Sequence, residues 1–144
     1  MDPTPLPDAL ARLLAATGVP QSPSRFRARI GPLVLSIPIT RAIARTILLH
    51  DLHHIATGYP TTLIGEAEIA AWELAGGCGR HAAAWAINIP SMALGLLLAP
   101  RRTLRAFARG RGVVNLFRRD PAAATLSQTT GALRARLSKS ETQP

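Results

Sequence analysis

Glycines and prolines divide this chain into apolar stretches of helical length, and this punctuation constrains its fold more than any other feature. The breaks fall at Gly58-Tyr59-Pro60, at Gly76-Gly77 and at Pro100, and apolar residues between them recur at the spacing of one helix face. Helices are predicted over residues 8–17, 39–56, 63–74, 81–98, 101–109 and 122–137, with a kink or break at Pro90. No stretch predicts a sheet. The expected class is therefore all-α, a single-domain helical bundle.

A chain of 144 residues has the usual length of one domain. Residues 1–38 form a proline-rich N-terminal segment with one short helix, residues 39–137 form the helical domain, and residues 138–144 form a polar tail. The N-terminus has neither the basic region nor the apolar region of a secretory signal. We therefore expect a cytoplasmic protein.

The net charge of +9 is distributed unevenly. Residues 1–49 carry six arginines and two aspartates, residues 50–100 carry one arginine and four acids, and residues 101–144 carry ten basic residues and two acids. Basic ends indicate an anionic partner, either nucleic acid or a membrane surface. No helix-turn-helix or zinc-finger pattern accompanies the charge, and Cys78 is the single cysteine. A membrane surface is thus the expected partner, and nucleic acid is not.

The acidic middle of the chain contains a cluster of residues that can bind a metal. On a helix with about 100° per residue, His50, Asp51 and His54 point to one side, whereas His53 lies further round. Glu66 lies near the start of the next predicted helix, which can turn back toward this side after the glycine–proline break. Two nitrogen ligands with one or two oxygen ligands suit Zn²⁺, and also Fe²⁺ or Mn²⁺. The spacing predicts a metal site between two consecutive helices.

Other acids near this cluster have competing interpretations. Glu73 lies seven residues after Glu66, on the same helix face, and either supports a metal-bound histidine or, as we favour, is a solvated surface acid. Glu68 is expected at the surface.

Two enzyme classes use motifs similar to the one at His50, Asp51 and His54. A zinc protease needs a glutamate between its histidines as general base, and this chain has the shorter aspartate. A His-Asp phosphohydrolase needs a histidine upstream, and none precedes His50.

The longer stretch from His50 to Glu66 resembles the COQ-four family, the fourth protein of coenzyme Q biosynthesis. It reads His-Asp-x-x-His, then Gly-x-Pro-Thr, then Gly-Glu. Further on, Gly110-Arg111 and the Asn-Leu-Phe at residues 115–117 are similar to that family's Gly-Arg segment and its Asn-Leu-Tyr. The resemblance covers about residues 39–137.

This resemblance implies an all-helical protein with a metal, usually zinc, and by motif match the ligands are His50, Asp51, His54 and Glu66. It implies removal of the ring carboxyl at C1 of a polyprenylated hydroxybenzoate precursor of ubiquinone, with these residues acting through the metal. The alternative is a scaffold that binds the precursor without catalysis and whose metal is structural. Four protein ligands without an open position favour the scaffold, and an open position favours the enzyme.

The resemblance also implies work at a membrane with other quinone-biosynthesis proteins. The apolar residues 82–98 can line a channel for a polyprenyl tail or form a core helix, and the resemblance favours the lipid role. The arginines that follow Pro100 can contact anionic headgroups. We expect peripheral association with the inner face of a bacterial membrane. The sequence leaves open whether the chain forms a homodimer.

Overall fold

The structure, a computed structural model, describes residues 2–17, 25–30, 33–119 and 126–138, with the backbone alone over 25–30 and 33–37. Its elements follow the order α1 Leu6–Thr17, β1 Arg25–Ile30, β2 Leu33–Pro38, α2 Arg41–Thr57, α3 Leu63–Gly76, α4 Ala82–Leu98, α5 Pro100–Gly110 and α7 Thr130–Ser138. The predicted helical bundle is confirmed, and candidate metal-binding residues lie on the consecutive helices α2 and α3.

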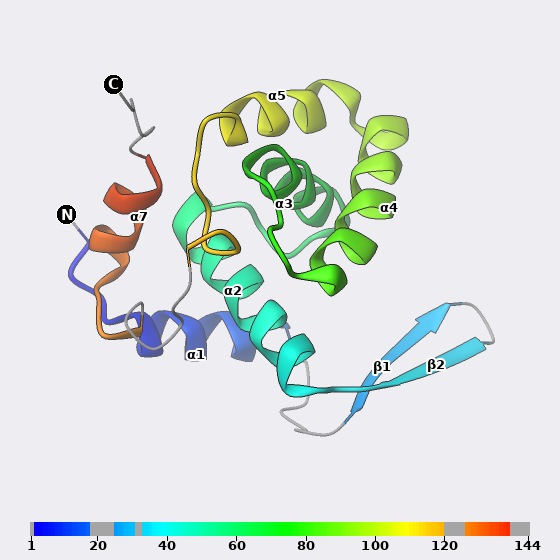
Figure 1. Cartoon of the computed structure of the whole chain (residues 1–144), viewed down its shortest axis with the longest axis horizontal. Helices are drawn as coiled ribbons and strands as arrows, with labels where there is room; N and C mark the ends of the chain where they lie inside the picture. The colour runs from blue at the N-terminus through cyan, green and yellow to red at the C-terminus, as the bar shows by residue number, and fades with distance from the viewer. Residues whose placement is uncertain (1, 18–24, 31–32, 120–125, 139–144) are drawn as a thin grey trace.

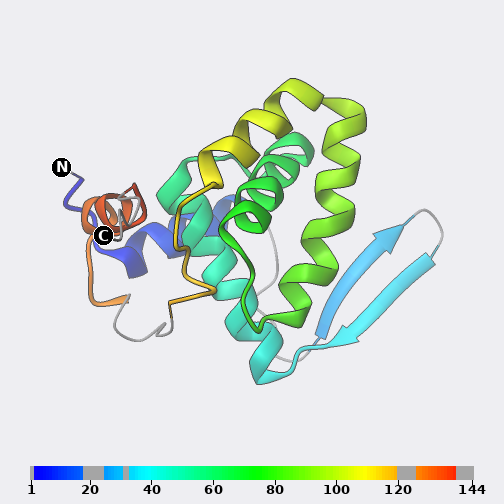
Figure 2. The same ribbon diagram turned by 45° about the horizontal axis from the view of Figure 1, so that its top comes forward.

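Helix α3 is the central element of the bundle (Figures 1 and 2). It packs most extensively against α4 and α5 and also contacts α2, whose other side contacts α1 and α7. Nine of its fourteen residues are buried, including Trp72 and Glu73. Because neighbouring helices pack against α3 on several sides, the positions of its polar side chains are well defined.

Side-chain and backbone caps explain where the two site-bearing helices begin and end. The hydroxyl of Thr40 accepts a bond from the N–H of Ile43 at the start of α2, and Thr62 does the same for Gly65 in α3. The N–H of Gly58 donates to the carbonyl of His54 and ends α2. These ends agree with the predicted helices to within two residues.

Two predictions need adjustment at proline-containing segments. Helix α4 continues through Pro90, where a break was one expectation. Pro90 lies on the exposed face, so solvent can bind the carbonyl that loses its helical donor.

The N-terminal segment contains an antiparallel hairpin, β1–β2, in which Arg25 pairs with Pro38 and Ile30 with Leu33. No strand is predicted here from the sequence, although residues 25–29 alternate basic and other side chains, a period-2 pattern typical of a strand.

The C-terminal prediction is met only in part, because residues 120–125 lie outside the described residues. Within the described part, Leu126 is helical, residues 127–129 are not, and α7 spans Thr130–Ser138, so the single predicted helix is interrupted. The chain's first residues pair with the segment before this helix: the N–H of Leu6 donates to the carbonyl of Gln128, and the N–H of Thr130 donates to the carbonyl of Thr4. The two ends of the described chain are thereby joined.

The outer face of α4 carries exposed apolar side chains. Ile87, Ile89, Leu97 and Leu98 are all more than half exposed, and Leu97 is 81% exposed. Within the described residues, no helix combines the length and the apolar character needed to cross a bilayer.

The end of α5 packs so closely on α3 that only glycine fits there. A Cβ built on Gly110 would collide with the backbone carbonyl of Trp72, next to Glu73 in the chain. We expect Gly110→Ala to lower the free energy of unfolding by about 1–3 kcal/mol, because backbone must move to admit the methyl group. Urea denaturation measures the change. The matched control is Ala108→Ser at an exposed position of the same helix, expected within about 0.5 kcal/mol of wild type. Unchanged stability of Gly110→Ala would contradict this packing.

Candidate metal centre

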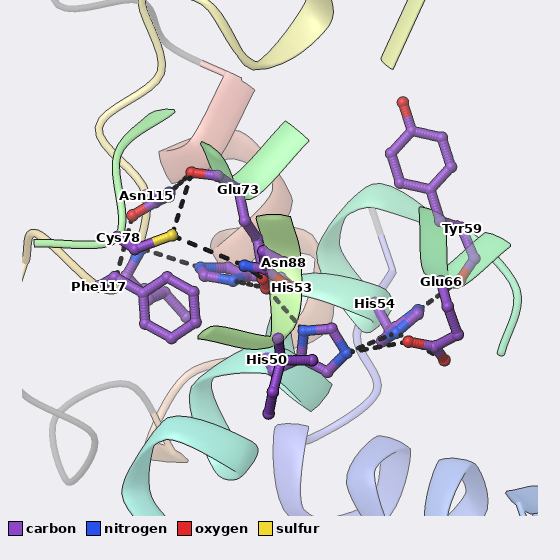
Figure 3. Close-up of polar contacts among 12 residues, drawn as sticks. His50, His53, His54, Tyr59, Glu66, Glu73, Cys78, Asn88, Asn115 and Phe117 are labelled. Atoms are coloured by element: carbon purple, nitrogen blue, oxygen red, sulfur yellow. Dashed lines mark hydrogen bonds and ion pairs between the residues drawn. The ribbon is translucent and has the colours of Figure 1, made fainter. Parts of the chain in front are cut away.

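Three side chains from α2 and α3 converge on one point (Figure 3). The imidazoles of His50 and His54 and the carboxylate of Glu66 offer ligand atoms that all lie within 4.8 Å of one another. The two Nε2 atoms are 3.1 Å apart, Glu66 Oε2 is 3.2 Å from His50 Nε2, and Glu66 Oε1 is 3.3 Å from His54 Nε2. We call these three residues the metal trio, because a His/His/Glu group of this kind can hold a metal ion.

Local structure explains why the trio converges. His50 and His54 are four residues apart on α2 and so share one helix face. Glu66 lies in the first turn of α3, where the positive end of the helix dipole favours a carboxylate. A Cβ on Gly65 would collide with the carbonyl of Pro60, so the glycine lets the connecting turn lie tightly against α3. This tight return brings Glu66 back over α2.

The outer nitrogens of both histidines are occupied by acceptors, which fixes the role of the inner ones. His54 Nδ1–H donates to the carbonyl of Tyr59 at 2.8 Å, and His50 Nδ1–H donates to Glu73 Oε1 at 2.9 Å. When both rings are neutral, both Nε2 atoms carry a lone pair and face each other beside the two oxygens of Glu66. Four electron-rich atoms in one small space repel one another unless a cation lies among them. The donor set thus fits a metal ion.

The electrostatics of the metal-free cluster show that a proton on His50 balances the carboxylates when no metal ion is bound. Burial lowers the pKa of His50, but the carboxylates of Glu73 and Glu66 outweigh burial and raise this pKa to about 10. Burial raises the pKa values of Glu66 and Glu73, yet the histidines that contact them bring both pKa values down to about 2. Both carboxylates are therefore ionised at neutral pH, and His50 is protonated between them, so a metal ion would take the place of the proton on His50 Nε2.

Asp51 is the one sequence-predicted ligand outside the trio. Within the described part of the chain, the group whose ligand atoms meet within 4.8 Å is His50, His54 and Glu66. Asp51 is partly buried beside them, and burial raises the pKa of its carboxyl. Coordination by Asp51 stays a prediction.

Glu73 and Glu68 are both buried, and the expectation that they are surface acids is wrong. Glu73 is 0% exposed and Glu68 is 7% exposed. Arg102 on α5 binds both oxygens of Glu68, through Nε at 3.0 Å and Nη2 at 2.7 Å. A face that looks solvent-exposed in the sequence is covered by helices packed over α3.

His53, set aside as a ligand from its direction on the helix, is absent from the trio and is fully buried. Its Nδ1–H donates to Glu73 Oε1 at 2.7 Å. Sequence reasoning did not assign this role or those of Asn88 and Asn115, which also contact Glu73. The available signal was the spacing of three from His50 to His53, which places both histidines on adjoining parts of one face.

No protein-family model matches this chain, and neither curated proteins nor solved structures match it.

Substitution of each trio member tests the ligand set. We expect His50→Ala, His54→Ala and Glu66→Gln each to lower Zn²⁺ affinity by more than about 100-fold, because each removes one of three direct ligands. Asp51→Asn is expected to lower affinity less, since its carboxylate lies outside the trio. Competition titration with a chelating indicator measures the affinities, and circular dichroism verifies folding. A loss in Asp51→Asn as large as in the trio variants would show that Asp51 is a fourth ligand.

Proposed function

We propose that this protein is a metal-dependent carboxy-lyase of ubiquinone biosynthesis that removes the C1 carboxyl of a polyprenylated hydroxybenzoate precursor. The observation that carries the proposal is the metal trio, whose two Nε2 atoms and one carboxylate face a common point. The resemblance of the segment from His50 to Glu66 to the COQ-four family supplies the reaction and substrate class. Zn²⁺ is the metal we propose, with Fe²⁺ or Mn²⁺ as the alternatives.

The exposure of the trio supports chemistry over a purely structural metal. The side chain of His54 is 1% exposed, whereas those of His50 and Glu66 are 22% and 40% exposed. The centre is therefore closed on the side of His54 and reachable on the side of Glu66. Three protein ligands with one reachable side are typical of catalytic zinc sites, which keep a coordination position for substrate.

The protein's own groups hold and orient the reaction centre. When bound, a divalent ion would supply a Lewis acid for a carboxylate or phenol oxygen of the substrate. Loss of CO₂ breaks the bond between ring carbon C1 and the carboxyl carbon, the electron pair stays on the ring, and C1 takes up a proton. Glu66, the most exposed member of the trio, lies where the substrate would enter.

The alternative function is a non-catalytic scaffold that presents lipid-linked precursors to other quinone-biosynthesis enzymes. Coordination by Asp51 would favour it, because this carboxylate would close the coordination shell if it joined the trio. A closed four-residue shell would make the metal structural. The Asp51→Asn titration therefore also bears on the choice between enzyme and scaffold.

Loss of the gene is expected to block the pathway before the carboxyl is removed. A deletion strain should accumulate a prenylated ring precursor that still carries its carboxyl, detected by mass spectrometry of extracted lipids. The wild-type gene should restore the quinone pool, and the Glu66→Gln gene should not. The Arg12→Glu gene is the control, because Arg12 is exposed on α1 and outside the trio, and it should restore the pool. An unchanged quinone pool in the deletion strain would refute the pathway.

We also propose that α4 and α5 form a peripheral membrane-binding surface. The exposed apolar side chains of α4 are followed directly by exposed Arg101 and Arg105 on α5. Apolar area and basic side chains together give the two-part anchoring that stable peripheral binding needs. Arg102 is bound to Glu68, so we do not count it among the headgroup-binding residues.

Charge reversal separates this surface from the general positive charge of the protein. We expect Arg101→Glu/Arg105→Glu to weaken binding to anionic vesicles by at least about 30-fold, since each arginine near an anionic surface contributes about 1 kcal/mol. The control Arg12→Glu/Arg41→Glu makes the same change in net charge on α1 and α2 and should bind nearly as wild type does. Vesicle sedimentation at several salt concentrations measures the binding. Equal weakening in both double variants would refute a localised surface.

A further inference from the structure

We propose that Glu73 is the positioning residue of the metal centre, and that through His53 it makes residues 113–117 part of the same unit. This inference rests on metal binding by the trio, which is part of the proposed function. It assigns a role to a buried polar network that is neither ligand nor substrate site.

Glu73 is a carboxylate enclosed by donors. Its Oε1 accepts bonds from His50 Nδ1–H at 2.9 Å and from His53 Nδ1–H at 2.7 Å, and its Oε2 accepts one from the amide of Asn88 at 2.6 Å. The side chain of Glu73 is 0% exposed. Within the described part of the chain, no arginine or lysine forms an ion pair with it.

A carboxylate buried in this way needs a compensating positive charge. The group that connects it to the metal centre is His50, whose Nδ1–H faces Glu73 while its Nε2 faces His54 and Glu66. A cation held by the trio would bind Nε2 of the same imidazole whose Nδ1–H donates to Glu73. A carboxylate behind a metal-binding histidine fixes the tautomer and makes the nitrogen a stronger ligand.

His53 extends the network away from the metal. The backbone N–H of Leu116 donates to His53 Nε2 at 2.9 Å, so this nitrogen is the acceptor and Nδ1 carries the proton given to Glu73. The ring lies edge-on to Trp72 and Phe117, with centroids 5.1 and 4.9 Å away. The orientation of His53 is therefore set from both nitrogens and from both sides.

The segment 113–117 is tied to the residue Glu73 a second time. The amide of Asn115 donates to the backbone carbonyl of Glu73 at 3.1 Å, and its oxygen accepts from the N–H of Phe117. Asn115 and Leu116 are almost completely buried although they belong to no helix or strand. Irregular segments usually lie at the surface, because buried backbone needs partners. Here the metal-facing network supplies those partners.

Removing only the charge of Glu73 tests its role. We expect Glu73→Gln to lower Co²⁺ and Zn²⁺ affinity by about 10–100-fold, the range found when a supporting carboxylate is changed. The visible absorption of bound Co²⁺ should also change, because His50 is no longer held in the same way. Glu68→Gln is the matched control: it makes the same substitution at another buried acid of α3, one bound by Arg102. The control should keep both the affinity and the spectrum of the wild type.

Hydrogen exchange tests the link to residues 113–117. Metal loading should slow exchange of the Leu116 amide in wild type and in Glu68→Gln, and should slow it far less in Glu73→Gln. Spectra of ¹⁵N-histidine-labelled wild type give a measurement that needs no variant. In the Zn²⁺-loaded protein, His50 and His53 should both be protonated at Nδ1.

Each result decides one question. Unchanged Co²⁺ affinity and spectrum in Glu73→Gln, equal losses in Glu68→Gln, or Nε2 protonation of His53 would overturn the positioning role. A wild-type protein that binds neither Co²⁺ nor Zn²⁺ would instead overturn the metal centre, and with it the proposed function. If Glu73→Gln fails to fold, the histidine tautomers of the wild type decide the matter.

Discussion

The carboxylate of Glu73 is the group on which the arrangement of this protein's interior depends. It receives bonds from two histidines of α2 and from Asn88 of α4, while its own backbone carbonyl binds Asn115. If one of these donors were lost, part of the desolvation penalty of the buried carboxylate would no longer be offset. The relative positions of α2, α3, α4 and the segment 113–117 are therefore constrained at one point.

The geometry of the metal trio follows from this constraint. Glu73 fixes His50 from inside the protein, and the carbonyl of Tyr59 fixes His54 at the end of its helix. Each partner occupies an outer nitrogen, so both inner nitrogens are directed at Glu66. Because the supports are a buried helix and a capped turn, the three ligand atoms are already in place before a cation binds.

The molecule thus holds a buried polar network within an apolar core, while its exterior is apolar along α4 and basic on α5. One side of α3 contributes Glu66 and Glu73 to the centre, while Glu68 is bound by Arg102 of α5. Beyond α3, α4 exposes apolar side chains that a lipid surface could cover. A prenylated substrate has the same division, with a polar ring and an apolar tail, which is why the proposed function suits this layout.

The sequence by itself determined the helices and the convergence of His50, His54 and Glu66, because helical periodicity and a glycine–proline turn act over a few neighbouring residues. It did not determine the surroundings of Glu73, although the spacing of seven placed it on the face of Glu66. The alternation at residues 25–29 was likewise not enough to predict the β1–β2 hairpin. Periodicity says which way a side chain points, whereas burial depends on which distant elements pack over it. Only the tertiary structure placed His53, Asn88 and Asn115 around Glu73, since those contacts join segments up to 42 residues apart.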